Sequence, residues 1–353
     1  MNNSAPLPKL ACRNVWKVYG RHPACYFDSR GYVIDPDALA KRMRSEGHLP
    51  AVADASFEVA AGEIFVIMGL SGSGKSTLVR CLSRLVEPSA GEILLDGLDL
   101  LKATGKELIE LRRRAMGMVF QNFGLLPHLN TLDNVAFPLK IQGKPVKERE
   151  ARAREMIALV GLEGREASFP HQLSGGQQQR VGIARSLAVG PELWFLDEPF
   201  SALDPLIRRQ MQDEFLRLQR MLKKTIIFIT HDMAEAFRLA DRLAIMRAGK
   251  IVQIGRPADI VLNPGDDYVA QFTEDMPLLR VIKAGDLAAP LNGAAAPEES
   301  VAADADLEEL IPRLASGVRA FSVPDRGAGP PALLTANSVL TVLEREQTRR
   351  TRP

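Results

Sequence analysis

The sequence contains few cysteines and no long apolar run, and both absences narrow the class of protein. Its 353 residues include only three cysteines, Cys12, Cys25 and Cys81, an odd number without the spacing of zinc ligands. We therefore expect reduced structural thiols, not disulfides or a zinc site. No apolar stretch approaches the roughly 20 residues that a membrane-spanning helix needs, and the N-terminus has no signal-peptide pattern. These features predict a soluble protein of the cytoplasm.

The sequence also lacks an excess of charge of one sign. Its 45 lysines and arginines nearly balance 43 aspartates and glutamates, which gives a net charge of +2. Proteins with a dedicated nucleic-acid surface usually carry a clear basic excess, so we expect no nucleic acid as a partner. The length corresponds to about two or three domains of ordinary size.

A glycine-rich loop directly follows an apolar strand, predicted at Glu63–Met68. The loop residues are Gly69, Leu70, Ser71, Gly72, Ser73, Gly74, Lys75, Ser76 and Thr77. The glycines allow backbone N–H groups to turn toward a polyphosphate at the positive end of the following helix. Lys75 is placed to reach the β- and γ-phosphates, and the Ser76 hydroxyl to ligate Mg²⁺. The strand and helix around the loop favour a nucleotide site over a flexible turn.

Three further apolar strands are separated by helical patterns, which predicts a largely parallel α/β sheet. They are expected at Met116–Phe120, Leu193–Leu196 and Thr225–Thr230. Ligands of open parallel sheets bind beyond the carboxyl ends of the strands. Groups that act on a phosphate are therefore expected directly after these strands.

Each of these strands ends at a polar side chain. Asp197 is predicted to bind Mg²⁺, and Glu198 to orient or deprotonate the water that attacks the γ-phosphate. His231 is predicted to contact the γ-phosphate or that water. Gln121 is predicted to reach Mg²⁺ or a water. Taken alone, each is equally consistent with an ordinary turn, cap or surface residue.

A second glycine turn begins at Leu173 and leads into another helix. Its residues Ser174 and Gly176 offer a hydroxyl and N–H groups to a phosphate. One nucleotide does not need two such turns in one chain. The simplest use is a head-to-tail homodimer, in which Ser174 and Gly176 contact the nucleotide of the other subunit. The alternative is a turn that only starts a helix.

In this order, the motifs resemble those of the ATP-binding cassette (ABC) ATPases over about Leu10–Phe272. The loop at residues 69–77 is similar to Walker A, Asp197 with Glu198 to Walker B, Gln121 to the Q-loop, Leu173–Gln177 to the signature, residues 201–204 to the D-loop and His231 to the switch histidine. The resemblance implies that ATP contacts Tyr19 by stacking, the loop at residues 69–77, and Ser174, Gly176, Gln177 and Asp204. It also implies Mg²⁺ as a cofactor.

The same resemblance implies the fold. It is the P-loop NTPase fold of the α/β class, with a RecA-like parallel sheet core, an antiparallel β subdomain and an α-helical signature subdomain at about 122–180. We expect an ABC ATPase domain at 1–275 and a linker at 276–306, which is rich in Ala, Pro, Gly and acidic residues. A small C-terminal extension at 307–353 follows, long enough for at most one degenerate cystathionine-β-synthase-type module.

More narrowly, the chain resembles the ATP-binding subunits of quaternary-amine importers. The resemblance rests on an insertion at 21–50, on Gly62–Leu70 and on Phe200–Arg208. The insertion is predicted to contain a helix that begins after Asp35 and stops at Gly47. The resemblance implies a subunit that hydrolyses ATP for uptake of glycine betaine, proline or a related amine.

The partners and location follow from the resemblance too. They are a second copy of the chain, two transmembrane permeases and, indirectly, a substrate-binding protein, at the cytoplasmic face of the inner membrane. The alternatives are an importer of another small solute, such as choline or histidine, a soluble ABC ATPase acting on nucleic acid, and a module that binds ATP without turnover.

Overall fold

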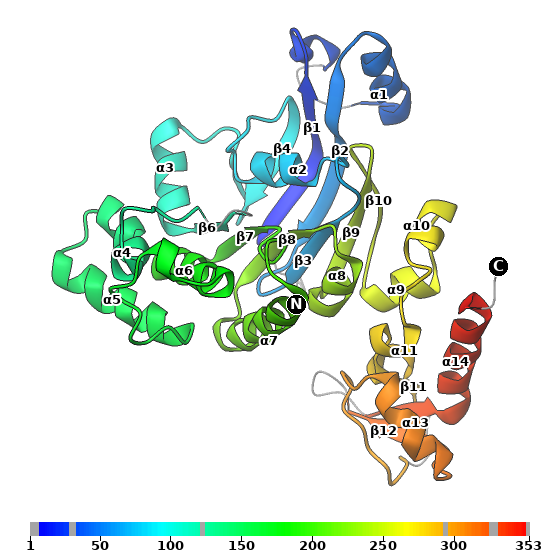
Figure 1. Cartoon of the computed structure of the whole chain (residues 1–353). Coiled ribbons are helices and arrows are strands. Elements are labelled where there is room, and N and C mark those ends of the chain that lie inside the picture. Colours follow the sequence, from blue (N-terminus) through cyan, green and yellow to red (C-terminus); the bar gives the residue numbers. More distant parts are fainter. Residues whose placement is uncertain (1–6, 28–32, 121–123, 292–295, 325–330, 351–353) are drawn as a thin grey trace, which may run out of the picture. The chain divides into compact units, whose positions relative to one another are not determined.

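The computed structural model describes residues 7–27, 33–120, 124–291, 296–324 and 331–350. The chain divides into two compact units, Met1–Val252 and Gln253–Pro353, and each is described by itself (Figure 1). No helix in these ranges is both long and apolar enough to cross a membrane.

The first unit contains a mainly parallel sheet in the order β10-β9-β3-β8-β7-β6. The strands are β10 (Lys250–Gly255), β9 (Arg242–Arg247), β3 (Ile64–Met68), β8 (Thr225–Thr230), β7 (Leu193–Asp197) and β6 (Met116–Val119). From β9 to β6 all neighbours pair in parallel. β3, β7 and β8 are buried along their whole length, which explains their continuous apolar sequences.

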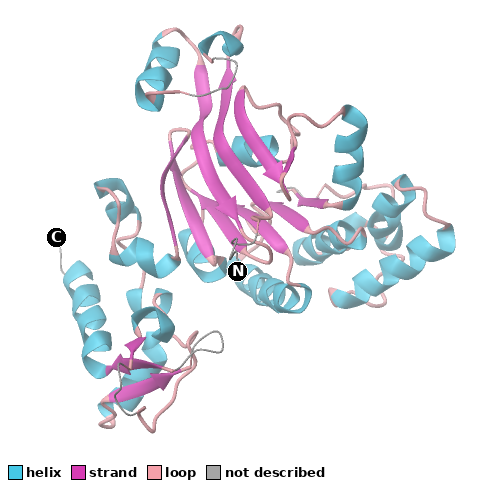
Figure 2. Cartoon of the chain, turned by 180° about the vertical axis from the view of Figure 1, so that it is seen from behind, coloured by secondary structure: helices cyan, strands magenta, loops and turns pink. Residues whose placement is uncertain are grey.

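A second sheet of this unit is antiparallel, in the order β2-β1-β4-β5. Its strands are β2 (Leu49–Val59), β1 (Leu10–Tyr19), β4 (Ala90–Leu95) and β5 (Leu98–Asp99). Helix α2 (Lys75–Leu82) contacts β1 and β2 of this sheet and β7 and β8 of the parallel sheet. Figure 2 shows the long strands of the unit curving past one another with helices beyond them. Both sheets therefore contribute to the surroundings of the loop that precedes α2.

The remaining helices of this unit include a group formed by α4, α5 and α6, which pack on one another (Figure 1). The helices after β5 are α3 (Gly105–Arg114), α4 (Thr131–Ile141), α5 (Val146–Leu159), η2 (Pro170–Gln172), α6 (Gly175–Ala188), α7 (Pro205–Leu222) and α8 (Met233–Leu239). The side chains of Ser174, Asp204 and Asp232 cap the first turns of α6, α7 and α8.

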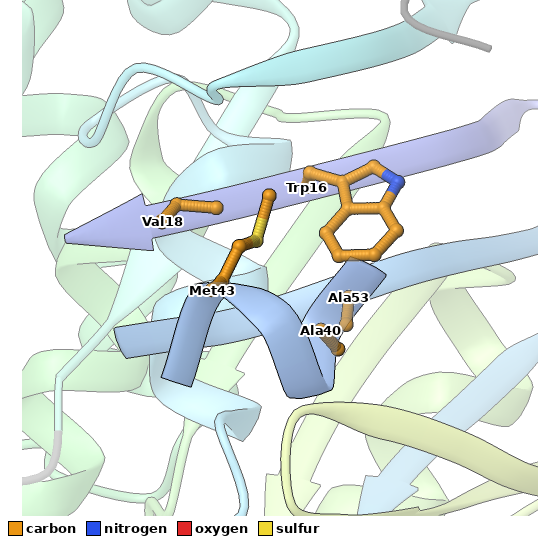
Figure 3. Close-up of a cluster of buried hydrophobic side chains, with 5 residues drawn as sticks. All are labelled: Trp16, Val18, Ala40, Met43 and Ala53. Atoms are coloured by element: carbon orange, nitrogen blue, oxygen red, sulfur yellow. The ribbon is translucent and has the colours of Figure 1, made fainter. Parts of the chain in front are cut away.

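The predicted insertion folds onto the antiparallel sheet. It contains η1 (Pro23–Tyr26) and α1 (Pro36–Ser45), and the Asp35 side chain caps α1 as expected. Ala40 and Met43 of α1 form a fully buried cluster with side chains of β1 and β2, namely Trp16, Val18 and Ala53 (Figure 3). Among the cysteines, Cys12 on β1 and Cys81 on α2 are buried, whereas Cys25 of η1 is exposed.

The second unit contains short helices and a small sheet in the order β11-β13-β12. Its elements are α9 (Pro257–Leu262), α10 (Asp267–Phe272), α11 (Leu278–Val281), α12 (Ala284–Leu287), β11 (Ala289–Pro290), α13 (Leu307–Ala315), β12 (Ala320–Val323), β13 (Ala332–Thr335) and α14 (Ala336–Arg350). The range 276–306, expected as a linker, thus includes α11, α12 and β11. Buried side chains of this range, such as Ile282 and Val301, belong to the same compact unit as Phe321.

Candidate functional site

Three neighbouring parallel strands end at the same edge of the sheet. Met68 of β3 is in register with Thr230 of β8, and Asp197 of β7 is in register with Ile229. The residues that follow these strands therefore meet at one place, as predicted from the sequence. The Glu198 N–H donates to the Ile229 carbonyl at 3.0 Å, which ties this corner to β8.

The loop after β3 has a backbone conformation that favours glycine at three positions. Gly69, Gly72 and Gly74 have φ values of 151°, 78° and 103°. A Cβ added at Gly69 would overlap the Met246 carbonyl oxygen, and one at Gly74 would overlap that of Ala51. The Ser73 hydroxyl is buried and has no hydrogen-bond partner within the described ranges. The loop is therefore held tightly and keeps a polar group for a ligand.

The Lys75 ammonium is folded back into this loop. Its Nζ donates to the carbonyl oxygens of Gly69, at 2.7 Å, and Leu70, at 3.0 Å. Burial lowers the pKa of Lys75, and the charges of Glu198 and Asp197 oppose that shift. Among the described residues, its hydrogen-bond acceptors are these two neutral carbonyl oxygens, so an anionic phosphate would be a stronger partner.

Ser76 and Asp197 are adjacent at the start of α2. The Ser76 hydroxyl donates to Asp197 Oδ1 at 3.1 Å. Burial raises the pKa of Asp197, while the Ser76 hydrogen bond and the charge of Arg80 lower it. The side-chain oxygens of these two neighbouring residues suit Mg²⁺ as ligands. This ion binds through oxygen ligands and commonly uses one or two carboxylates together with phosphates.

Glu198 and His231 form a pair. His231 Nδ1 lies 2.9 Å from Glu198 Oε2. An ionised carboxylate only accepts hydrogen bonds, so with an ionised Glu198 this contact uses the tautomer that carries its proton on Nδ1. Glu198 has a φ of 46°, a left-handed conformation that is uncommon for a residue with a side chain and that is found at functional sites. Gln121, the other predicted polar residue, lies outside the described residues.

A cleft of about 890 Å³ connects these groups with the insertion. Of the residues named from the sequence it is lined by Tyr19, Leu70, Ser71, Gly72, Gly74, Lys75, Ser76, Thr77, Glu198 and His231. Tyr19 is 44% exposed, and the Lys17 ammonium lies 5.0 Å from its ring centre. Lys17 itself does not line the cleft. The cleft therefore joins an aromatic ring to a phosphate-binding loop.

The signature residues lie elsewhere in the unit. Ser174 and Gln177 form a reciprocal capping box at the start of α6, and neither lines the cleft. Gly176 faces α7, since a Cβ there would lie 2.8 Å from Ile207 Cγ2. Asp204 caps α7 by accepting from the Ile207 N–H at 3.1 Å. Within one chain, these residues do not join the cleft.

Six residues line the cleft that the sequence did not single out. They are Arg44, Leu49, Pro50, Ala51, Ala248 and Gly249. The first four belong to the end of the insertion and the start of β2, and the last two to the β9–β10 turn. The one sequence signal that pointed to them was the position of the insertion directly after Tyr19.

Comparisons with known proteins agree on a single family. Residues 52–201 match the family described as ABC transporter. The trimethylamine N-oxide transport system ATP-binding protein TmoW of Ruegeria pomeroyi is 55% identical over 321 residues, which are 91% of this chain and 93% of that protein. The glycine betaine/proline betaine transport system ATP-binding protein ProV of Escherichia coli is 47% identical over 79% of this chain and 69% of its own length. These two relatives support the expected family.

A solved structure supports the fold. It is the dimeric structure of a post-hydrolysis state of the ATP-binding cassette MJ0796 bound to ADP and Pi. It is 31% identical to the chain, with a TM-score of 0.57, and the match covers 70% of this chain and 98% of the other. The P-loop fold expected from the resemblance is thereby confirmed.

Proposed function

The chain belongs to the ABC transporter family of ATP-binding subunits, and on this premise we propose that it hydrolyses ATP to drive import of a small methylated amine. Glycine betaine and trimethylamine N-oxide are the first candidates. The observation that carries the proposal is the length of the match to TmoW, which includes nearly the whole chain. A relative that shares only the catalytic motifs would not match over that length.

The cleft supplies the residues for binding and hydrolysis. The loop N–H groups and Lys75 bind the phosphates, while the Tyr19 ring stacks on the base. Glu198 accepts a proton from the attacking water, and the His231 N–H holds that carboxylate in place. Ser76 and Asp197 would hold Mg²⁺, whose positive charge offsets that of the phosphates. Gln121 is assigned to the same metal and water from its motif alone.

A second copy of the chain completes the site. Ser174, Gly176, Gln177 and Asp204 do not line the cleft of their own chain, so we assign them to the nucleotide of the partner subunit. ATP binding then closes two chains around two nucleotides, and hydrolysis removes the phosphate that bridges them. This is a shift between two states with different nucleotide contacts.

An apolar groove beside α4 suits the permease partner. It has a volume of about 400 Å³ and is lined by Phe120, Leu126, Phe137 and Ile141, among others. Phe120 and Ile141 are exposed although they are large and apolar. We assign this groove to a helix of a transmembrane subunit, which would place the chain at the cytoplasmic face of the membrane.

The base role is tested with Glu198→Gln. The variant keeps the size of the side chain and removes the proton acceptor, so ATP binding should persist while hydrolysis falls at least about 100-fold. Phosphate release and ATP titration of the purified chain measure the two effects. Hydrolysis at the wild-type rate would contradict the assignment.

The transport role is tested in vesicles that contain the chain, its permeases and its binding protein. Glycine betaine or trimethylamine N-oxide should accelerate ATP hydrolysis, whereas histidine should not. Acceleration by histidine alone would contradict the methylated-amine proposal. Stimulation of the isolated chain by duplex DNA would contradict transport itself.

A further inference from the structure

The insertion carries a cation to the cleft. Arg44, in the last turn of α1, lines the same cleft as Tyr19 and Lys75. None of the contacts assigned above uses this side chain. An exposed arginine on a surface helix usually extends into solvent. The position of Arg44 at the cleft therefore needs an explanation.

A hydrogen bond fixes the Arg44 guanidinium at the cleft. Its NH2 group donates to the Ala248 carbonyl at 2.9 Å. The next residue, Gly249, donates its N–H to the Ser73 carbonyl at 2.9 Å and accepts from the Ala53 N–H at 2.8 Å. Arg44 is therefore bonded to the same turn that contacts the phosphate-binding loop.

The helix that carries Arg44 is itself firmly attached. The preceding residue, Met43, is fully buried against Trp16 and Val18 (Figure 3). On the exposed side, Arg42 Nε donates to Glu46 Oε1 at 2.8 Å, and Glu46 accepts from the Tyr26 hydroxyl. Met43 therefore anchors α1 on the antiparallel sheet, and the Tyr26 hydroxyl joins its end to η1, so Arg44 projects from a helix that is packed in place.

The geometry of β2 distinguishes the phosphate end of the cleft from its Tyr19 end. The Ala51 carbonyl touches Gly74 of the loop, which marks the phosphate end of the cleft. Leu49 lies two residues earlier, about 7 Å along the strand, and is in register with Tyr19. The Tyr19 end of the cleft therefore suits the base and ribose, and this is the end at which the insertion joins β2.

We infer that Arg44 is a nucleotide-binding residue that contacts the base and ribose of ATP beside Tyr19. A planar guanidinium both stacks on aromatic rings and donates several hydrogen bonds, so it suits a nucleoside better than an ammonium does. The inference rests on the proposed function, because it takes ATP as the ligand. It gives the insertion a role in setting nucleotide affinity.

Binding of ADP and of a non-hydrolysable ATP analogue to the full chain tests this role. We expect Arg44→Ala to weaken both ligands by a similar factor, about fivefold, because both carry the same nucleoside. Arg44→Lys should recover only part of that loss. Lys41→Ala is the matched control, since Lys41 is exposed on the same helix but does not line the cleft, and it should bind as the wild type does.

Each contrary outcome has a distinct meaning. Equal affinity of Arg44→Ala and the wild type for both ligands would overturn the inference alone. A loss confined to the ATP analogue would place the guanidinium on the γ-phosphate and overturn the nucleoside contact. An equal loss in Lys41→Ala would show a general charge effect and overturn it as well. A wild-type chain that binds neither nucleotide would overturn the proposed function together with the inference. Melting of each variant without nucleotide shows that all are folded.

Discussion

Two buried ionisable side chains, Lys75 and Asp197, lie at the strand ends of the site. Burial lowers the pKa of Lys75 and raises the pKa of Asp197, so each side chain is held in surroundings that disfavour its charged form. Anionic phosphates and a divalent cation are the partners that would offset these costs. The same burial that disfavours these charges in the cleft therefore favours a bound nucleotide with its metal ion.

A buried carboxyl behind the site gives a stability prediction. Glu235 of α8 is buried and accepts from Gln212 Nε2 at 3.0 Å. Burial raises its pKa, and hydrogen bonds from Thr230 and Gln212 oppose the shift. Because the pKa is higher in the folded chain than in the unfolded chain, the contribution of Glu235 to stability is fully present below the unfolded pKa. It is lost as pH rises through the folded pKa.

We therefore expect Glu235→Gln to stabilise the chain at pH 8. The amide avoids burial of a charge, and the melting temperature should rise by about 2–4 °C, which corresponds to about 1 kcal/mol. The difference from the wild type should shrink as pH falls toward 4.5, the ordinary pKa of glutamate. Scanning calorimetry between pH 8 and pH 4.5 measures this difference in melting temperature. A difference that is constant with pH would show that charge burial is not the cause.

At the scale of single elements, the local sequence predicted the helix and strand ends that depend on contacts between residues close together in the chain. The ends of α1 follow from Asp35, whose carboxylate accepts two N–H groups, and from Gly47, with φ of 80°. The strands around the phosphate loop were also predicted to within one residue at each end. These features depend on residues within a turn or on an uninterrupted apolar run.

Contacts between distant segments were not predictable in this way. Arg44 and Ala248 are 204 positions apart, and their hydrogen bond exists only because the insertion and the β9–β10 turn meet in the fold. In the second unit, Leu340 of α14 is 46% exposed, whereas Val339 and Val342 of the same helix are buried. The orientation of the helix in the fold decides which of these apolar side chains face inward.

The contact between α1 and the antiparallel sheet can be tested by truncating Met43. Removal of its buried side chain leaves a cavity beside Trp16 and should lower the free energy of unfolding by about 2–4 kcal/mol. We expect Met43→Ala to reduce the hydrogen-exchange protection of the α1 amides, while the exposed Lys41→Ala does not. Unchanged protection in Met43→Ala would show that α1 does not depend on this cluster.

At the scale of the whole molecule, the proposed nucleotide site is shared between two chains. The side chain of Ser174 caps α6 and is not part of its own cleft. The sequence predicted such a division, because one nucleotide does not need two glycine turns. The comparisons show the family, and the assignment of individual residues across a dimer is a prediction.

Two substitutions of Ser174 separate its capping role from its proposed contact with phosphate. In a Glu198→Gln background, ATP should produce dimers, since the bridging phosphate is not removed. Ser174→Asp keeps a capping oxygen but brings a negative charge to the phosphate, so dimers should be lost. Ser174→Asn also caps and carries no charge, so it should retain far more dimer. Light scattering gives the mass, and equal dimerisation of both variants would contradict the contact.

The distribution of the three cysteines makes the insertion accessible to chemical labelling. Cys12 and Cys81 are buried, and burial raises the pKa of both thiols, that of Cys81 to about 12, which suppresses the reactive thiolate. Cys25 is exposed in η1, a few residues along the chain from Tyr19. A maleimide fluorophore should therefore attach at a single position in the natural sequence. Its emission would report nucleotide binding and release on the intact chain, without any engineered cysteine.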